Sequence, residues 1–441
     1  MADELFFTRR DMLKRGATLL SAAATVPYFL DRTALAMAEP RKSGRRTGKN
    51  NERILVVVQL AGGNDGLNTV VPIGNDRYYR ARPAIGIKKE DTLRINDELA
   101  FPKSAEGFKR LYDDGLLAVV QGVGYPNPNR SHFVSTDIWS TADPDERVHN
   151  GWIGRYFDCT CKGNDRPDPK TGIALVQESP LAMQGERFTP VSFGSPEELT
   201  WRGPAAGGRG TNAFNKLNGT KRRPGRKNEM PDDEASALAY LERMAMDARA
   251  SAEEIKQATG TNSSPRNEGI RFRFRNRGAG GDLGQKLEMV KRMIAAGLET
   301  KVYYVSMGGF DTHAGQLGRH QTLIQQLGEA LHEFTASLRE DKMLDRVTIM
   351  TFSEFGRRVA ENGSQGTDHG AAAPLFVIGE GVRAGVHGEH PSLEPDQLDA
   401  GDLKWNTDFR SIYSAVLTDW MNADAGRILG GDYPKIRLFN T

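Results

Sequence analysis

The sequence has little cysteine and no surplus of charge of either sign. Cys159 and Cys161 are the only cysteines among 441 residues, so a four-cysteine zinc site is excluded. One residue separates them, which leaves a strained disulfide and two buried thiols as the alternatives. The 59 Lys and Arg residues nearly balance the 57 Asp and Glu residues. A nucleic-acid-binding surface is therefore not expected.

Long apolar runs are also missing. Beyond residue 38, no stretch approaches the roughly 20 apolar residues that a helix needs to cross a bilayer. We therefore expect a soluble mature protein without a membrane span. A chain of 441 residues is long enough for one large α/β domain or two ordinary ones.

The N-terminus has the pattern of an export signal. The pair Arg9-Arg10 precedes a moderately apolar stretch at residues 16–30, and the small-x-small sequence Ala36-Met37-Ala38 follows. This order is typical of a twin-arginine (Tat) signal peptide, which a receptor recognises to direct the protein to export. We predict that residues 1–38 are this signal, that the twin-arginine translocase is the partner during export, and that the protein is periplasmic or extracellular. An amphipathic first helix with a chance arginine pair is the alternative.

Acidic and histidine side chains follow three apolar runs that have the composition of buried strands. The run at residues 54–60 precedes Asp65, the run at 301–307 precedes Asp311 and His313, and the run at 347–352 precedes Glu354. The carboxyl ends of parallel strands meet at one edge of a sheet, where the groups that perform chemistry are placed. We therefore expect these side chains to lie close together.

Carboxylate oxygens and imidazoles are the ligands that zinc, manganese and magnesium bind in proteins. The sequence predicts a site for a divalent metal, zinc or manganese, at this edge. The predicted ligands are Asp65, Asp311, His313, Glu354, Asp368 and His369. The alternative is a fold that keeps the carboxylates as helix caps and ion-pair partners without metal, and Asp65 in particular can cap the helix or turn that follows it.

Ser131 is the predicted nucleophile. It follows a strand at residues 116–123 and a turn-rich segment, at the expected start of a helix. The positive end of the helix dipole can hold an anion and activate a hydroxyl there. Arg130 and Arg357 are the candidate clamps for the negative charge that develops during transfer. The alternative is that Ser131 only caps the helix.

The remaining histidines are expected to have supporting roles. His132 either supports the metal ligands from behind or packs as an aromatic ring. His320 and His332 fall within one long helix and are predicted to be surface or packing residues. His387 and His390 follow a glycine-rich turn, for which a structural role is favoured.

The second half of the chain alternates between helical and strand patterns. The expected elements are a helix at 283–297, a strand at 301–307, a helix at 317–340, strands at 347–352 and 375–378, and a helix at 408–421. This alternation predicts a three-layer α/β/α sandwich with a mostly parallel sheet. We predict a single domain at 53–441, after a flexible linker at 39–52. An insertion at about 200–280 is expected to cover the site.

Six short motifs are spread over nearly the whole mature chain. They are Gly62-Gly63-Asn64-Asp65-Gly66-Leu67-Asn68, Arg130-Ser131-His132-Phe133, Gly308-Gly309-Phe310-Asp311-Thr312-His313, Ser353-Glu354-Phe355-Gly356-Arg357, Thr367-Asp368-His369-Gly370 and Thr407-Asp408-Phe409-Arg410. In these motifs the chain resembles the exported bacterial family called domain of unknown function 1501. That family is similar in turn to the alkaline phosphatase and sulfatase superfamily, so the resemblance implies an alkaline phosphatase-like sandwich with a two-metal site.

The resemblance also implies roles for single residues. Asp65 and Ser131 match the first metal-binding aspartate and the nucleophile of the superfamily. Asp311, His313 and His369 match one metal site. The second metal would be held by Asp65 together with the glutamate of the Ser-Glu-Phe-Gly-Arg motif.

The sequence departs from the superfamily pattern in two places. Phe355 stands where a histidine is expected, and the Asp-x-His spacing of Asp311 and His313 replaces a longer one. Neither cysteine lies in the C/S-x-P-x-R pattern that formylglycine sulfatases carry, and Ser131 is not followed by it, so that activity is not expected.

Two functions follow as hypotheses. The first is an exported, metal-dependent hydrolase of phosphate or related small esters that uses Ser131 as its nucleophile. The alternative is a non-catalytic periplasmic binding or assembly protein that retains the sandwich fold.

Overall fold

The structure is a computed structural model that describes residues 53–160, 168–195, 252, 254–259 and 280–440. The predicted signal peptide at 1–38 and linker at 39–52 lie outside the described residues. Most of the predicted insertion at about 200–280 and Cys161 also lie outside them. The expectation that the insertion covers the site therefore stays a prediction, as does the state of the cysteine pair.

A large, mostly parallel sheet forms the centre of the fold. Its strand order is β11-β5-β10-β9-β1-β8-β6-β7, and β12 also pairs with β5. The strands are β1 (Ile54–Leu60), β5 (Leu117–Gly124), β6 (Gly172–Leu175), β7 (Val191–Ser192), β8 (Val302–Met307), β9 (Val347–Phe352), β10 (Ala373–Ile378), β11 (Gly385–His387) and β12 (Thr407–Asp408). Among the strands of this sheet that the structure describes, only β10 pairs antiparallel to its neighbours, β5 and β9.

Strand β1 shows why the central strands read as continuous apolar runs. Ile54, Val56 and Val58 belong to one buried cluster, and Leu55 and Val57 belong to the cluster on the opposite face. Both faces of the sheet are covered, so every position needs an apolar side chain, which is typical of parallel sheets. The expected strand bounds at β1 and β9 agree with the structure for this reason.

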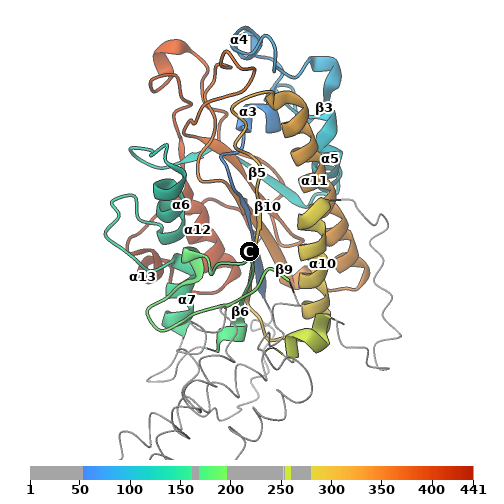
Figure 1. The fold of residues 1–441 in the computed structure, drawn as a ribbon, viewed down its shortest axis with the longest axis vertical. Helices are drawn as coiled ribbons and strands as arrows, with labels where there is room; N and C mark the ends of the chain where they lie inside the picture. The colour runs from blue at the N-terminus through green and yellow to red at the C-terminus, as the bar shows by residue number, and fades with distance from the viewer. Residues whose placement is uncertain (1–52, 161–167, 196–251, 253, 260–279, 441) are drawn as a thin grey trace, which may run out of the picture.

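Helices cover both faces of the sheet and complete the three predicted layers (Figure 1). On one face lie α5 (Glu106–Asp113), α10 (Gly281–Ala295) and α11 (Gln316–Glu340). On the other lie α6 (His132–Thr141), α7 (Trp152–Thr160), α12 (Phe409–Ala415) and α13 (Ala425–Leu429). The α/β/α sandwich with a mostly parallel sheet is thus confirmed.

A small antiparallel sheet, which the sequence did not indicate, lies beside the first layer. Its order is β2-β4-β3, formed by β2 (Val71–Pro72), β3 (Thr92–Arg94) and β4 (Leu99–Pro102). Two short helices, α3 (Gly66–Thr69) and α4 (Asp76–Ala81), lie in the same part of the chain.

The helix expected at 408–421 is divided in the structure: α12 continues as a π-helix over Val416–Trp420. Arg53 donates hydrogen bonds to the carbonyls of Asp419 and Trp420 at its end.

Candidate functional site

The candidate site lies where four loops meet at one edge of the large sheet. The loops follow β1, β5, β8 and β9, four strands that run in the same direction. Two glycines, one in the first motif and one directly before the Thr-Asp-His-Gly motif, allow the loops to approach closely. A Cβ at Gly62, where φ is +120°, would lie 2.4 Å from the amide nitrogen of Asp311, and one at Gly366 would lie 2.2 Å from the carbonyl carbon of His313. Side chains at these positions would push apart the loops that carry the site.

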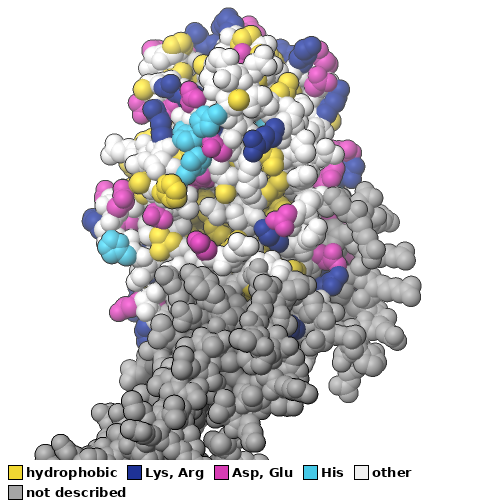
Figure 2. Space-filling view, viewed as in Figure 1, with side chains coloured by type: hydrophobic (Ala, Val, Ile, Leu, Met, Phe, Trp, Pro, Cys, Tyr) yellow, Lys and Arg dark blue, Asp and Glu magenta, His cyan; other side chains and the backbone are white. Residues whose placement is uncertain are grey.

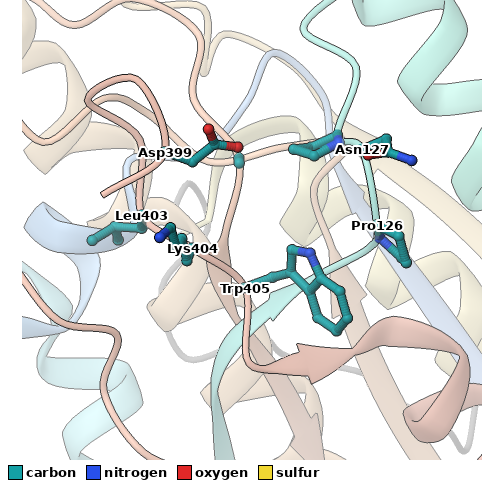
Figure 3. Close-up of a pocket in the computed structure, with 8 residues that line it drawn as sticks. Pro126, Asn127, Asp399, Leu403, Lys404 and Trp405 are labelled. Carbon is teal, nitrogen blue, oxygen red and sulfur yellow. The ribbon is translucent and has the colours of Figure 1, made fainter. Parts of the chain in front are cut away.

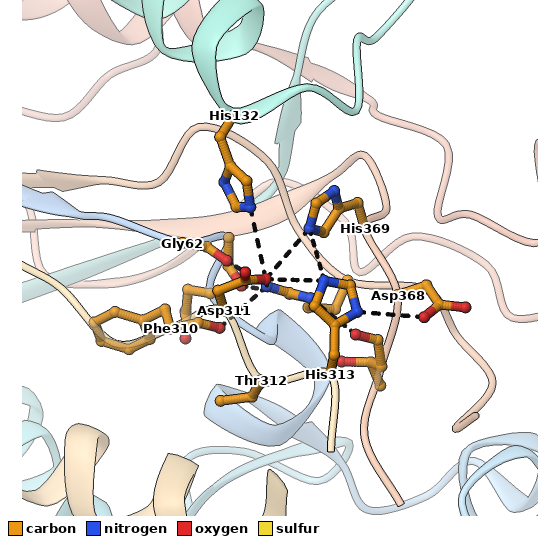
Figure 4. Close-up of polar contacts among 12 residues, drawn as sticks. Gly62, His132, Phe310, Asp311, Thr312, His313, Asp368 and His369 are labelled. Carbon is orange, nitrogen blue, oxygen red and sulfur yellow. Dashed lines mark hydrogen bonds and ion pairs between the residues drawn. The ribbon is translucent and has the colours of Figure 1, made fainter. Parts of the chain in front are cut away.

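Three imidazoles point toward one oxygen of Asp311 (Figure 4). The Nε2 atoms of His313, His369 and His132 lie 3.0, 3.3 and 3.6 Å from Asp311 Oδ1. The ligand atoms of His132, Asp311 and His369 all lie within 4.8 Å of one another. His313 joins this group through Asp311 and through a distance of 3.0 Å between its Nε2 and that of His369. We call these four residues the His/Asp cluster.

The other ring nitrogen of each histidine is held by an acceptor. His132 Nδ1 lies 2.8 Å from Glu354 Oε1, and His369 Nδ1 lies 2.8 Å from the carbonyl oxygen of Arg130. His313 Nδ1 makes a longer contact of 3.4 Å with Asp368 Oδ1. These acceptors place the proton of a neutral imidazole on Nδ1. The Nε2 lone pairs are then free to bind a metal, as is usual for histidine ligands.

A cation fits this arrangement, and its absence would leave lone pairs facing one another. Two deprotonated Nε2 atoms repel each other at the 3.0 Å that separates His313 and His369. The Nε2 of His132 is buried and has no hydrogen-bond partner. Four tetrahedral ligands at the zinc–ligand distance of about 2.0–2.1 Å lie about 3.3 Å apart, and the contacts to Asp311 Oδ1 span 3.0 to 3.6 Å. The donor types and the separations of the three imidazoles from Asp311 Oδ1 therefore match a divalent metal site, with His132, Asp311 and His369 as the group whose ligand atoms all lie near one another.

The local electrostatics favour the metal-binding protonation states. Partial burial raises the pKa of Asp311, but the hydrogen bond and the charge of Arg357 outweigh it and lower the pKa to about 2. Burial lowers the pKa of His369, despite the hydrogen bond to the carbonyl of Arg130 that raises it. An ionised carboxylate and a neutral imidazole are the forms that bind metal.

The cluster is open to solvent on one side. The side chains of Asp311 and His313 are 48% and 45% exposed, and histidine side chains gather beside acidic ones at the surface in Figure 2. On the inner side, the ring of Phe355 packs against those of His132 and His369, with centroid distances of 4.9 and 4.6 Å. Phe355, which departs from the superfamily pattern, is thus an apolar wall of the cluster.

The buried side chain of Arg357 links the loops of the site through hydrogen bonds. Its side chain is fully buried and donates to the backbone carbonyls of Gly62, Gly63, Phe310 and Thr367. Its Nη2 also lies 2.6 Å from Asp311 Oδ1. These contacts bind the guanidinium to three of the four loops, so the structure gives Arg357 a positioning contact with Asp311. Arg357 was predicted to clamp a substrate. That role would need N–H donors on the solvent-exposed side of the cluster, whereas the side chain of Arg357 is buried.

Two of the predicted ligands, Glu354 and Asp368, contact histidine rings at Nδ1. Glu354 is 2% exposed, and its Oε1 accepts hydrogen bonds from the amide of Gly62 and from His132. Asp368 is exposed, and its Oδ1 accepts a hydrogen bond from Asn362 at 3.1 Å besides the contact with His313. In this structure both carboxylates contact the Nδ1 side of an imidazole, where they orient the ring.

The structure does not bring Asp65 to the cluster. Its carboxylate is fully buried, with Oδ2 2.6 Å from Arg82 Nη1 and in contact with Gln316 Nε2. Oδ1 accepts a hydrogen bond from the amide of Asn68, so Asp65 caps α3, which was the alternative reading of its position. Both oxygens of Asp65 are therefore engaged. The buried guanidinium of Arg82 needs this carboxylate as its partner. We therefore leave Asp65 out of the candidate metal site.

Ser131 and Arg130 border the cluster. Ser131 is exposed and immediately precedes α6, but its side chain makes no capping hydrogen bond to that helix. The capping alternative is therefore not what the structure shows. Arg130 pairs with the buried Asp402 through Nε at 2.8 Å and Nη2 at 2.5 Å. Its guanidinium is engaged there, while its carbonyl orients His369.

His132 is the cluster residue that the sequence reasoning did not assign as a ligand. Its position directly after Arg130-Ser131, at the start of a helix that follows a central strand, is the signal that could have placed it there.

The remaining histidines lie outside the cluster. His320 is buried as a packing residue and contacts Asn64 Oδ1 at 3.0 Å, and burial lowers its pKa to about 4. His387 and His390 contact backbone carbonyls, as expected of structural residues.

Comparison with known proteins places the chain in a family. The family described as "Protein of unknown function (DUF1501)" matches residues 118–409, about two thirds of the sequence. This chain belongs to the DUF1501 family. The match includes four of the six motifs in full, the first three residues of a fifth, and three of the four loops of the site. No curated protein matches the chain.

Solved structures similar to this member of the DUF1501 family include one named as a sulfatase and one named as a synthase. The PsFucS1 sulfatase from Pseudoalteromonas sp. has 11% identity over 95% of this chain and 77% of that chain, with a TM-score of 0.35. The lipoteichoic acid synthase LtaP from Listeria monocytogenes has 9% identity over 94% and 82%, with a TM-score of 0.34. Ps i-CgsB in complex with k-i-k-neocarrahexaose has 9% identity over 86% and 74%, with a TM-score of 0.34. These values carry no argument about activity. Within the described residues, no helix is long and apolar enough to cross a membrane.

Proposed function

We propose that this chain is a metal-dependent hydrolase of phosphate or related esters. The observation that carries the proposal is the convergence of three imidazole Nε2 atoms on Asp311 Oδ1 at a half-exposed position. A divalent metal, zinc or manganese, would supply Lewis-acid stabilisation of the charge that develops on the ester oxygens. His132, His313, His369 and Asp311 would hold it.

The surrounding residues prepare these ligands. Glu354 and the carbonyl of Arg130 keep the protons of His132 and His369 on Nδ1, so that Nε2 is available. Arg357 fixes Asp311 through a hydrogen bond of 2.6 Å and stabilises its ionised form. The exposed side of Asp311 and His313 leaves room for an ester, as a catalytic site requires.

Ser131 is the proposed nucleophile. It is exposed, it adjoins His132, and it precedes the N-terminus of the ten-residue helix α6, whose dipole favours an anion. In the proposed reaction its hydroxyl oxygen bonds to phosphorus and loses its proton, while the ester oxygen leaves as an alcohol after taking up a proton. Water then hydrolyses the phosphoserine, which releases phosphate and restores the hydroxyl.

The first test combines metal analysis with turnover. Protein purified after native export is expected to contain close to one equivalent of zinc or manganese and to hydrolyse 4-nitrophenyl phosphate or 4-nitrophenyl sulfate. Asp311→Asn is expected to lose both the metal and the turnover, because it removes the one charged ligand. Ser131→Ala is expected to keep the metal and lose turnover.

The matched control is His387→Gln, which removes a half-buried histidine on β11 and should change neither result. Metal-free wild-type protein that stays metal-free after incubation with zinc and manganese would contradict the proposal. Metal that binds without turnover of any ester would favour the alternative, a non-catalytic binding protein.

We also propose that the protein works outside the cytoplasm after export by the twin-arginine translocase. The support is the arginine pair, the apolar stretch and the small-x-small sequence at residues 36–38. Arg9→Lys/Arg10→Lys is expected to keep nearly all of the protein in the cytoplasm, because the receptor reads the paired guanidiniums. Cell fractionation measures the distribution. Export of this variant at the wild-type level, with Lys14→Arg as the control, would rule out the twin-arginine route.

A further inference from the structure

A hollow with a volume of about 410 Å³ opens among the loops that follow β5 and precede β12 (Figure 3). Eight residues line it: Pro126, Asn127, Pro128, Ala371, Asp399, Leu403, Lys404 and Trp405. The first three come from the loop that continues to Ser131, and the last four come from the segment before β12. Its volume is within the range of sites for small ligands.

The loops that line the hollow also support the His/Asp cluster. The loop that supplies Pro126 and Pro128 continues into Arg130, whose carbonyl holds His369. The side chain of Arg130 pairs with Asp402, which lies between two lining residues of the segment before β12. Ala371 lines the hollow two residues after His369. A ligand in the hollow would therefore lie beside the loops that present the metal ligands.

The lining offers two kinds of surface. Trp405, Pro126 and Pro128 contribute an indole and two proline rings to the lining (Figure 3). Asn127, Asp399 and Lys404 add an amide, a carboxylate and an ammonium, and all three residues are exposed. Donors and acceptors thus surround an apolar wall, which is the pattern of a site that orients a ligand with a few polar groups.

We propose that this hollow binds a pyranose ring, the sugar part of an ester that the His/Asp cluster hydrolyses. The C–H face of a pyranose packs on aromatic and proline rings, and its hydroxyl groups both donate and accept hydrogen bonds. The mixed set of Asp399, Lys404 and Asn127 matches such hydroxyls. An aliphatic chain would desolvate Asp399 and Lys404 without pairing them, and the carboxylate of Asp399 would repel a second anionic group. This assignment of the substrate class rests on the proposed hydrolase function.

The test uses the full mature protein and three sugar phosphates: glucose 6-phosphate, galactose 6-phosphate and mannose 6-phosphate, with phenyl phosphate for comparison. Binding is measured by saturation-transfer NMR, in which ring protons that contact the protein gain signal, and turnover is measured as kcat/KM. At least one sugar phosphate is expected to bind through its ring protons and to exceed phenyl phosphate in kcat/KM. Trp405→Ala is expected to weaken its binding about tenfold, or about 1.4 kcal/mol.

Trp405→Phe keeps a ring face and should retain most of the affinity. Lys404→Ala changes an exposed side chain, so it tests the hollow even if Trp405→Ala does not fold. Ring-proton contacts that persist in Asp311→Asn would support the hollow even if hydrolysis failed. Equal turnover of sugar phosphates and phenyl phosphate, unchanged by Lys404→Ala and Trp405→Ala, would support the hydrolase and overturn the sugar site. Absence of sugar binding in the wild type would also overturn it.

Discussion

Arg82→Met is expected to lower the free energy of unfolding by about 3–5 kcal/mol. The side chains of Arg82 and Asp65 are both fully buried, and their charged groups lie 2.6 Å apart. Removing the guanidinium leaves a carboxylate without its partner in the interior, which costs more than the ion pair itself contributes. Chemical denaturation of the mature protein, followed by circular dichroism, measures the change.

The other contacts of Arg82 add to this cost. It donates to the carbonyls of Val359 and Arg358 and to the side chain of Asn68, each at 2.8 Å. It thereby links the segment after β1 to the loop that carries Arg357. The matched control is Arg80→Met, an exposed arginine on α4, the helix that ends directly before Arg82, and it should change stability by no more than about 0.5 kcal/mol. Equal losses in the two variants would contradict a special role for the buried pair.

A double variant and a pH series isolate the charge of Asp65. Asp65→Asn/Arg82→Met is expected to recover part of the loss, because no buried charge then remains unpaired. Burial raises the pKa of Asp65, but the charges of Arg82 and His320 outweigh it, so the pKa lies below its ordinary value of 3.8. The contribution of a depressed pKa is complete above the ordinary value and is lost as pH falls through the folded-state value. The wild type should therefore lose stability below pH 3.8 more steeply than the double variant.

The sequence predicted those parts of the fold that depend on local apolar patterning. Strands β1 and β9 were bounded correctly because both of their faces are buried. The antiparallel direction of β10 could not be read, because an apolar strand has the same composition in either direction. The division of the helix at 408–421 was also missed, since the π-helical turn depends on packing and on the distant Arg53.

The candidate site was predicted in part, for a related reason. A residue placed just beyond a strand reaches this edge of the sheet, which is why Asp311 and His313 lie there after β8, and His369 joins them from the loop after β9. The same rule cannot tell whether the side chain then faces solvent or the interior. Asp65 faces the interior because Arg82 is buried there, and seventeen residues of sequence separate the two. His132 was not assigned as a ligand because only the fold brings α6 to Asp311.

Arg357→Lys is expected to weaken metal binding by about 10–100-fold. The guanidinium of Arg357 contacts four backbone carbonyls and Asp311 Oδ1 at once. A lysine ammonium is a single point with three donors, so it cannot reach all of these acceptors, although it keeps the charge. Asp311 would then lose its fixed position among the imidazoles. Titration of metal-stripped protein with zinc, followed by calorimetry, measures the affinity.

The matched control is Arg346→Lys, because Arg346 precedes β9 at the opposite end of the strand from Arg357 and bonds to a single carbonyl, that of Ile294. It is expected to leave zinc affinity unchanged. Thermal unfolding of both variants separates a loss of metal ligands from a loss of the fold, since a folded Arg357→Lys protein with weakened zinc binding is the expected outcome. Wild-type zinc affinity in folded Arg357→Lys would show that the ligand positions do not depend on this guanidinium. The site would then be organised by the close approach of the loops at Gly62 and Gly366, which the lysine variant leaves intact.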